Sequence, residues 1–427
     1  MQLQINNYSF WLTLHHKLDL LSKYCAVLAA FFIPISTALM TVFFLTTVGL
    51  MILSGRWHEK WLLIKSNPLT WCALLLFALL FIGMFYSQTD WHNRLSELNK
   101  YHKLLFIPLL MPVFAEEKWR KAGFYAFLVA MFITLVLSYA KFYFDVTLSS
   151  HTFKYSSAAV FRDHISTNIF MAFFAYLLLY YSWTTKTPYR WLLLCFALLA
   201  VWDNLFMSMG RTGYVVFAAL MILLCWQLFS WRGIALGLFG IIILIFASFK
   251  LSPPFQHRIL LTLANVQKYQ QSHKVEHNAI RQKELASTST GLRLSWLRNS
   301  LTMWQTKPII GIGTGAYKTV YMKMFPPNRY TPSDNTYNDI LNLAVQLGLL
   351  GFLAVLLLYI WQWRLTFSLP HVDKPLAQAL LITTITGGLV NCVLRDTVEA
   401  HFYVYFSALF FSTYYQSKLD ARNHSFK

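Results

Sequence analysis

Apolar runs alternate with short polar loops over most of the chain, and this alternation predicts an all-α protein that crosses a membrane many times. Many of the runs reach or approach the roughly 20 residues that a helix needs to span a bilayer. One run, residues 24–54, is too long for a single span, so we divide it at Pro34. Twelve spans result, near residues 22–35, 38–54, 69–86, 102–115, 122–143, 166–183, 190–207, 212–229, 233–250, 341–362, 376–394 and 401–416.

Residues 251–339 form the long polar segment of this pattern. The segment is basic, because it carries eleven Lys or Arg residues against four Asp or Glu residues. It divides the chain into nine predicted spans within residues 1–250, a loop over 251–339, and three spans with a polar tail within 340–427. We therefore expect the membrane helices to hold this loop over a substrate at one side of the membrane.

The long loop is itself predicted to be largely helical. Residues 265–286 are rich in charged side chains and predict one solvated helix. Residues 289–306 predict a second, amphipathic helix, which Pro308 ends. The apolar stripe of this second helix consists of Leu297, Leu301 and Trp304. Because Arg293 lies at the N-terminal end of the same stripe, we expect it to face the membrane domain.

Three glycines follow this helix, at positions 311, 313 and 315. A Gly-x-Gly-x-Gly pattern is a weak sign of nucleotide binding unless a strand precedes it, and the sequence shows no strand pattern here. We instead expect a tight turn or a close approach of two backbones.

Composition supports the membrane assignment. Hydrophobic residues make up 57% of the chain and charged residues only 12%, against roughly 25% charged in an ordinary soluble domain. All five cysteines lie inside apolar runs, so their spacing suggests neither a metal site nor a disulfide framework. The net charge of +19 fits basic cytoplasmic loops together with an anionic partner such as a phosphate-bearing lipid. Membrane lipids are expected as partners, and nucleic acid is not.

Lys and Arg residues in the short loops predict the orientation of the chain. The side that holds both termini has sixteen of them, and the opposite side has seven. Because cytoplasmic loops carry the excess, we expect both termini in the cytoplasm and residues 251–339 outside it. A loop of this length is exempt from the rule, so its own charge does not argue against this orientation. No cleavable signal peptide is expected at the N-terminus.

Arg211 is the sharpest candidate for chemistry. It lies in Ser208-Met-Gly-Arg-Thr-Gly213, a minimal outer loop whose glycines let a ligand approach. Its planar, permanently charged fork suits a pair of phosphate oxygens. The alternative is an interfacial anchor whose charged end reaches the lipid headgroups.

Other arginines also lie close to the outer ends of spans. Arg162 is followed by Asp163 and His164, and either binds substrate or belongs to a structural ion pair. Arg395 is followed by Asp396 and precedes Glu399 and His401, which is typical of a charge network at a helix end.

The outer loops contain no Asp-x-Asp pair and no cluster of His and Cys with the spacing of metal ligands. A diphosphate leaving group needs its developing negative charge neutralised, and without a metal only Arg and Lys provide this. Several outer arginines therefore fit transfer from a polyprenyl-diphosphate donor with no metal and no cofactor.

The chain resembles the bacterial O-antigen ligase and O-antigen polymerase superfamily of the inner membrane over nearly its whole length. The likeness rests on the spans, the long outer loop after the ninth span, and four motifs. These are (Ser)-x-x-Arg-Thr-Gly at Arg211, Arg293-x-x-Trp296, Pro308-x-x-Gly-x-Gly, and Asn338-Asp-Ile-Leu-(x)6-Gly348. The resemblance implies an inverting, metal-independent glycosyltransferase whose Arg211 and Arg293 engage the lipid diphosphate at the periplasmic face.

One position departs from the family pattern. The family usually has a histidine before the Asn of the last motif, thought to deprotonate the acceptor hydroxyl, and here the residue is Tyr337. A tyrosine with a pKa near 10 is a poor base at neutral pH unless nearby arginines lower that value. Either arginines activate Tyr337, or Asp334 or Asp339 replaces the histidine, or the chain is an inactive form. Tyr337 as a purely interfacial aromatic is the structural alternative.

The sequence thus predicts an O-antigen ligase that moves a glycan from undecaprenyl diphosphate to a sugar hydroxyl of lipid A-core. The alternatives are the polymerase of the same superfamily, a protein O-glycosyltransferase, and a twelve-helix transporter. Tyr337, Arg211 and Arg293 are the predicted catalytic residues. The predicted substrate-binding residues are Arg162, His164, Arg298, Asn338, Asp334 and Arg395.

Overall fold

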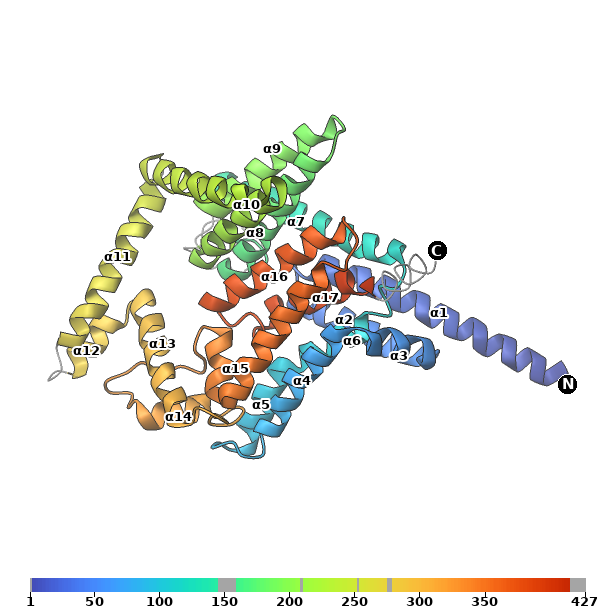
Figure 1. Cartoon of the computed structure of the whole chain (residues 1–427), viewed down its shortest axis with the longest axis horizontal. Helices are drawn as coiled ribbons and strands as arrows, with labels where there is room; N and C mark the ends of the chain where they lie inside the picture. Colours follow the sequence, from blue (N-terminus) through green and yellow to red (C-terminus); the bar gives the residue numbers. More distant parts are fainter. Residues whose placement is uncertain (1, 145–158, 208–209, 252, 275–278, 415–427) are drawn as a thin grey trace.

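The computed structural model describes residues 2–144, 159–207, 210–251, 253–274 and 279–414, and these residues form helices and turns without a strand. The helices pack as a bundle from which the start of α1 projects (Figure 1). The first part of the chain forms α1 (Gln2–Phe32), α2 (Thr37–Leu53), α3 (Trp57–Ser66), α4 (Pro68–Gly83), α5 (Trp91–Tyr101), η1 (His102–Leu105), α6 (Phe106–Leu110), α7 (Glu117–Phe144), α8 (His164–Thr184), α9 (Tyr189–Trp202) and η2 (Asp203–Met207). The second part forms α10 (Arg211–Leu251), α11 (Pro253–Lys274), α12 (Ala279–Ala286), α13 (Ser289–Thr306), α14 (Tyr317–Met324), α15 (Asp339–Thr366), α16 (Asp373–Val390) and α17 (Thr397–Phe411).

Within the described residues, five helices are long and apolar enough to cross a membrane, and the bent pair α3 and α4, with an angle of 85°, is a sixth candidate. These findings confirm a helical membrane protein. They do not reach the predicted count of twelve, because several predicted spans are short or broken. The 102–115 segment, for example, is divided between η1 and the five-residue α6. The five are α7, α8, α9 with η2, the Arg211–Ile243 part of α10, and α15.

Two predicted breaks between spans are present. Chain direction changes between α1 and α2, where the hydroxyl of Ser36 accepts from Leu39 N and caps α2. Within α10, Phe229 and Ser230 leave the helical conformation, and Ser230 has a φ of +56°. The long apolar stretches at residues 24–54 and 212–250 are therefore each divided in two.

One expectation for the long loop is wrong, and another lies partly outside the described residues. Of residues 265–286, those up to Lys274 belong to α11, which begins at Pro253, and those from Ala279 belong to α12, while residues 275–278 lie outside the described residues. The buried face of α13 is not the stripe of Leu297 and Leu301, which are 36% and 44% exposed. That face carries small and polar side chains that allow close packing, namely Gly291, Ser295, Asn299, Ser300 and Met303.

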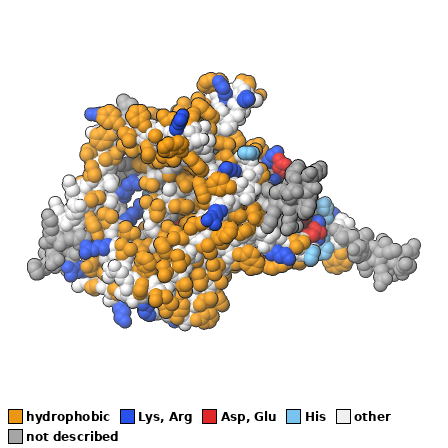
Figure 2. Space-filling view, viewed as in Figure 1, with side chains coloured by type: hydrophobic (Ala, Val, Ile, Leu, Met, Phe, Trp, Pro, Cys, Tyr) orange, Lys and Arg blue, Asp and Glu red, His pale blue; other side chains and the backbone are white. Residues whose placement is uncertain are grey.

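The core of the bundle surrounds α17. All of its residues from Glu399 to Phe411 are buried. Phe127 of α7 packs against Phe406 at a ring distance of 4.9 Å, and Phe173 of α8 packs against Phe402 at 5.2 Å. Hydrophobic side chains also cover most of the outer face in Figure 2, as expected of a surface in contact with lipid.

Within the long loop, residues 308–316 form hydrogen bonds to helices of the bundle, and we call this segment the strap. Gly348, with a φ of +66°, interrupts α15 beside it. The strap bonds to the interrupted turn, since Ile312 N donates to Val345 O at 3.0 Å and Gly313 N donates to Gln346 O at 2.9 Å. A Cβ on Gly313 would lie 2.2 Å from Ser87 Cα. The expected close backbone approach is confirmed, and its partners are α15 and the segment after α4.

Candidate functional site

Arg211 lies where three helices meet. It is the first residue of α10, and its Nη1 donates to Thr290 Oγ1 of α13 at 2.5 Å. Its Nη2 also donates to Ser289 Oγ, and Thr262 Oγ1 of α11 is 3.5 Å from Nη1. The neighbouring Ser208 of the predicted motif lies outside the described residues. The structure therefore places Arg211 against the first turn of α13. The same helix also carries Arg293.

Arg293 lies one turn further along α13 and covers Tyr337. Its Cζ is 5.6 Å from the centroid of the Tyr337 ring. Trp296, three residues on, stacks on the same ring at 4.8 Å with an interplanar angle of 13°. Burial lowers the pKa of Arg293, and among the described residues no carboxylate pairs with it. Arg293 still carries its positive charge at neutral pH, because the pKa of a guanidinium is far above 7. This charge is therefore available to an anion.

Two helix starts add to this positive region. The first N–H groups of a helix have no partner within it, and the helix dipole is positive there. Arg211 begins α10 and touches the beginning of α13, so two such ends lie close together. Thr288 caps α13 by accepting from Gly291 N at 3.1 Å. Anions, and phosphates above all, are bound by such helix ends.

Tyr337 has an uncommon backbone. Its φ is +53°, a region that few residues other than glycine adopt, and its N–H donates to Asn335 Oδ1 at 2.8 Å. Burial and then the charge of Asp334 raise the pKa of the Tyr337 hydroxyl, and Arg293 only partly opposes them. The charge of Arg293 alone therefore does not bring the Tyr337 pKa below its ordinary value, and activation of Tyr337 by arginines stays a prediction. Residues held in such a conformation gather at functional sites, so the position itself remains of interest.

Arg395 belongs to a buried charge network. Its Nε and Nη2 donate to Glu97 of α5 at 2.9 and 3.1 Å, and Nη2 also donates to Asp334 Oδ2 at 3.0 Å. Burial alone would lower the pKa of Arg395, but Glu97 and then Asp334 raise it above its ordinary value. The guanidinium that was predicted to bind substrate is thus taken up by two carboxylates.

Glu97 was missed by the sequence reasoning. It lies about 300 positions before Arg395 in the chain, and no local pattern joins the two residues. Gln346 Nε2 donates to Glu97 Oε1 at 3.1 Å, and Gln346 Oε1 accepts from Gly315 N. The charge network is therefore fixed to the strap.

Four other predicted substrate-binding residues lie elsewhere or serve the fold. Arg162 donates to the carbonyl oxygens of Phe32 and Ile33 at the end of α1. His164 is exposed at the start of α8, and Arg298 is exposed on α13 and hydrogen-bonds Tyr269 of α11. Asn338 caps α15 by accepting from Leu341 N.

The two aspartates suggested as substitutes for the histidine are engaged as well. Asp339 is fully buried, and both its oxygens accept from Leu394 N, at 3.2 and 3.1 Å. Burial would raise the pKa of Asp334, but the charge of Arg395 holds it below its ordinary value. Asp339 is closed to a substrate, and Asp334 is bound to Arg395.

A polar cavity of about 340 Å³ opens beside Tyr337, and we call it the Tyr337 cavity. Three carboxylates from two distant places in the chain line it, Asp163 before α8 and Asp396 with Glu399 at the start of α17. In the described parts of the chain, no group of His, Cys, Asp and Glu is arranged to hold a metal ion. The lining residues are Asp163, Ile165, Ser166, Asn335, Tyr337, Asn391, Asp396, Thr397, Val398 and Glu399.

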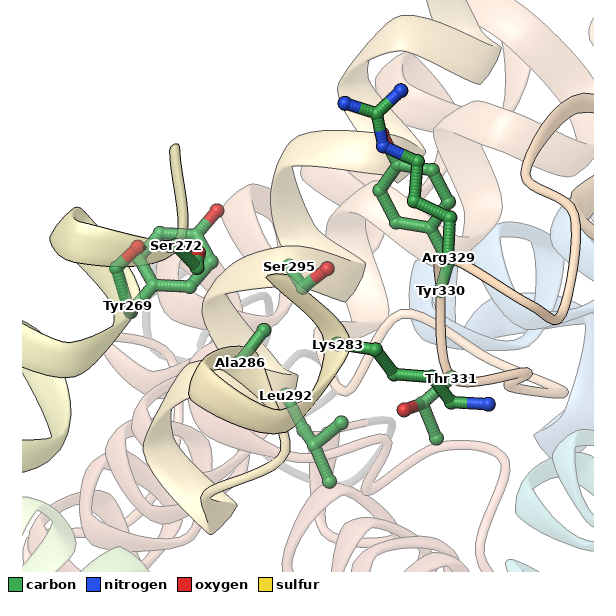
Figure 3. A pocket seen from close by; sticks show the side chains of 9 residues that line it. All are labelled: Tyr269, Ser272, Lys283, Ala286, Leu292, Ser295, Arg329, Tyr330 and Thr331. Atoms are coloured by element: carbon green, nitrogen blue, oxygen red, sulfur yellow. Dashed lines mark hydrogen bonds between the residues drawn. The ribbon is translucent and has the colours of Figure 1, made fainter. Parts of the chain in front are cut away.

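A second cavity lies on the outer side of α13, between α11, α12 and residues 329–331 (Figure 3). Tyr269 and Ser272 of α11 line one side, and Lys283 and Arg329 approach from the other. Its volume is only about 20 Å³, little more than one water molecule needs. It is too small for a sugar, so the Tyr337 cavity is the better candidate.

The fold and the site define a helical membrane protein with a basic site where α10, α11 and α13 meet. Residues 195–356 match the family model for O-antigen ligase, and this match supports the O-antigen ligase superfamily. The matched segment includes Arg211, Arg293, the strap and Tyr337, so the resemblance drawn from the motifs is confirmed. No curated protein matches the chain.

Proposed function

We propose that the chain is an O-antigen ligase of the bacterial inner membrane. It transfers a glycan from undecaprenyl diphosphate to a sugar hydroxyl of lipid A-core at the periplasmic face. The superfamily membership supports glycosyl transfer between lipid-linked substrates. The ligase rather than the polymerase is proposed because a net charge of +19 suits an acceptor rich in phosphate.

The observation that carries the proposal is the meeting of Arg211 with the first turn of α13. Arg211 and the starts of α10 and α13 meet there, and Arg293 follows in the next turn of α13 and covers Tyr337. A diphosphate carries the charge and the oxygen pairs that such groups bind. We therefore assign the donor diphosphate to this place, with its glycan extending past Tyr337 toward the Tyr337 cavity.

The proposed reaction is a single inverting displacement. The acceptor oxygen attacks the anomeric carbon of the donor glycan while the bond from that carbon to the diphosphate oxygen breaks. Negative charge then develops on the diphosphate, and Arg211 and Arg293 stabilise it without a metal. Positioning both substrates in one site contributes further, because it makes the bimolecular step effectively unimolecular.

The proposed topology places these groups outside the cytoplasm. Twelve spans, cytoplasmic termini and a periplasmic loop over 251–339 put Arg211, Arg293 and the Tyr337 cavity on the same outer side. The orientation is supported by the excess of Lys and Arg in the opposite loops.

The lipopolysaccharide of a deletion strain tests the ligase assignment. We expect uncapped core together with accumulated lipid-linked polymer, and complementation by the wild-type gene should restore the capped form. Core that bears a single repeat would instead identify a polymerase and refute the ligase.

Variants of the two arginines test the diphosphate site. Arg211→Ala and Arg293→Ala should each reduce transfer about 100- to 1000-fold, the range for loss of one group that stabilises a developing anion. Lys at either position should restore only part of the activity, because a point charge lacks the bidentate fork. Lys307→Ala is the matched control, since it removes one exposed cation from the other end of α13.

Full activity of both Lys variants would refute the fork argument, because simple positive charge would then be enough. Activity should survive EDTA, and loss of activity that added divalent cation restores would refute the metal-independent mechanism.

A further inference from the structure

Asp396 stands at the N-cap position of α17, yet its side chain does not cap the helix. Its backbone is extended, with φ −67° and ψ 149°, and among the described residues no N–H of the first turn donates to its carboxylate. Asp163 provides the comparison, because with a similar backbone its Oδ1 accepts from Ile165 N and Ser166 N at 2.7 and 3.1 Å. Aspartate is favoured at N-caps because it satisfies these donors, so Asp396 gives up that role.

The Asp396 carboxylate instead lines the Tyr337 cavity. Its Oδ2 accepts from Asn391 Nδ2 at 3.1 Å, while Oδ1 accepts from no donor among the described residues. Asp396 is near enough for its charge to raise the pKa of the Tyr337 hydroxyl. Tyr337 in turn contacts Arg293, so it forms a common boundary of the cavity and the arginine site.

The other carboxylates of the cavity are already engaged. Asp163 caps α8 with Oδ1, and its Oδ2 accepts from Ser166 Oγ at 2.8 Å. Glu399 is only 4% exposed, and its Oε1 lies 2.5 Å from the same Ser166 Oγ, whose single proton the two carboxylates share. Asp396 is therefore the lining carboxylate best placed to accept a proton from a bound molecule.

We propose that Asp396 is the general base of the transfer reaction and that the Tyr337 cavity holds the acceptor sugar. This inference rests on the proposed function. The acceptor O–H proton passes to Asp396 Oδ1 while the acceptor oxygen bonds to the anomeric carbon. The bond between that carbon and the diphosphate oxygen breaks, and its electron pair leaves with the diphosphate. Asp396 then releases the proton to water.

The surroundings of Asp396 suit a base. Burial raises its pKa above that of an ordinary aspartate, Arg395 and Lys103 oppose this rise, and Asp163 adds to it. Glu399 also faces the cavity and, like Asp163, disfavours a further negative charge. A carboxylate with a raised pKa accepts a proton more readily near neutral pH. Activity should fall as the pH drops through the pKa of Asp396, because only the charged form acts as a base.

Purified full-length protein with an undecaprenyl-diphosphate-linked glycan and lipid A-core provides the test. Asp396→Asn should reduce the transfer rate about 100-fold or more, the usual contribution of a general base, with donor binding within about twofold of wild type. Tyr337→Phe should stay within about tenfold. Asp90→Asn is the matched control, since Asp90 caps α5 outside the cavity and asparagine preserves that cap. An Asp396→Asn rate within a few-fold of wild type would overturn the proposal, as would loss of donor binding.

A rescue experiment separates a base from a structural residue. Histidine has a pKa near 6.5, so Tyr337→His places a new base on the rim of the same cavity. We expect the Tyr337→His, Asp396→Asn double variant to transfer glycan at least about tenfold faster than Asp396→Asn alone. An inactive double variant, with Tyr337→His alone active, would show that Asp396 is needed for another reason.

Two further measurements complete the test. If Asp396→Asn does not fold, Asp396→Glu replaces it, and a shifted acid midpoint of the pH–rate profile is expected. An unchanged midpoint would overturn the proposal. If the wild-type chain transfers glycan to a second lipid-linked glycan and not to lipid A-core, the ligase assignment is wrong. The role of Asp396 is then tested with the same variants on that second acceptor. A wild-type chain that transfers glycan to neither acceptor would overturn both.

Discussion

Removing the charge of Glu97 is expected to destabilise the protein more than removing the charge of an exposed carboxylate. Glu97 and Arg395 are 8% and 5% exposed and share two hydrogen bonds, at 2.9 and 3.1 Å. Loss of one partner of a buried pair costs about 3–5 kcal/mol, because the other charge remains buried without compensation. Asp334 still holds one side of Arg395 in Glu97→Gln, so we expect about 3 kcal/mol, the low end of that range.

This free energy converts to a change in melting temperature. An unfolding entropy of about 2.1 cal/mol/K per residue amounts to roughly 0.9 kcal/mol/K over 427 residues. A loss of about 3 kcal/mol therefore lowers the melting temperature by roughly 3–4 °C. Thermal unfolding of the detergent-solubilised protein, followed by tryptophan fluorescence, measures the shift.

Two variants make the measurement decisive. Glu59→Gln is the matched control, because the Arg56–Glu59 pair is more than 60% exposed on both sides and such pairs contribute about 0–1 kcal/mol. Adding Arg395→Met to Glu97→Gln removes the unpaired charge, so part of the lost stability should return. Equal melting temperatures for Glu97→Gln and Glu59→Gln would refute the reasoning, as would a double variant less stable than either single one.

The remaining predictions concern topology, the strap and pH. Reporter fusions within 260–330 should report the periplasm, and cytoplasmic reporters should be active after Lys65, Lys121, Lys186 and Lys374; a cytoplasmic signal from the long loop would reverse the orientation. Gly313→Ala should reduce folded protein in size-exclusion chromatography, because its Cβ would meet Ser87 Cα at 2.2 Å and its φ is +92°, whereas Gly240→Ala meets nothing within 4 Å and should be harmless. Arg395 holds the pKa of Asp334 below its ordinary value, so its stabilisation is present above about pH 4 and lost as the pH falls through the lower, folded-state value. The melting temperature of wild type should therefore fall below about pH 4 more steeply than that of Asp334→Asn, and parallel curves would contradict this.

The sequence alone determined the class of the protein and the places of several of its apolar helices. Long apolar runs in a membrane protein must form helices, because every backbone group in lipid needs a partner within the chain. The breaks near Pro34 and Phe229, and the start of α13 at Ser289, follow from local signals that the sequence carries. The motifs at Arg211 and Arg293 likewise identified the superfamily before any contact between them was known.

Only the tertiary structure decided which charged groups face one another. Arg395 and Glu97 are far apart in the chain, and so are Asp163 and Asp396. Whether an arginine is neutralised, or a tyrosine has its pKa raised, depends on burial and on partners from other helices, which no local pattern specifies. Packing between distant helices pairs Arg395 with Glu97 in a buried charge network, whereas the charge of Arg293 remains available to an anion. The same packing places Asp396, and not Asp339, in the wall of the Tyr337 cavity.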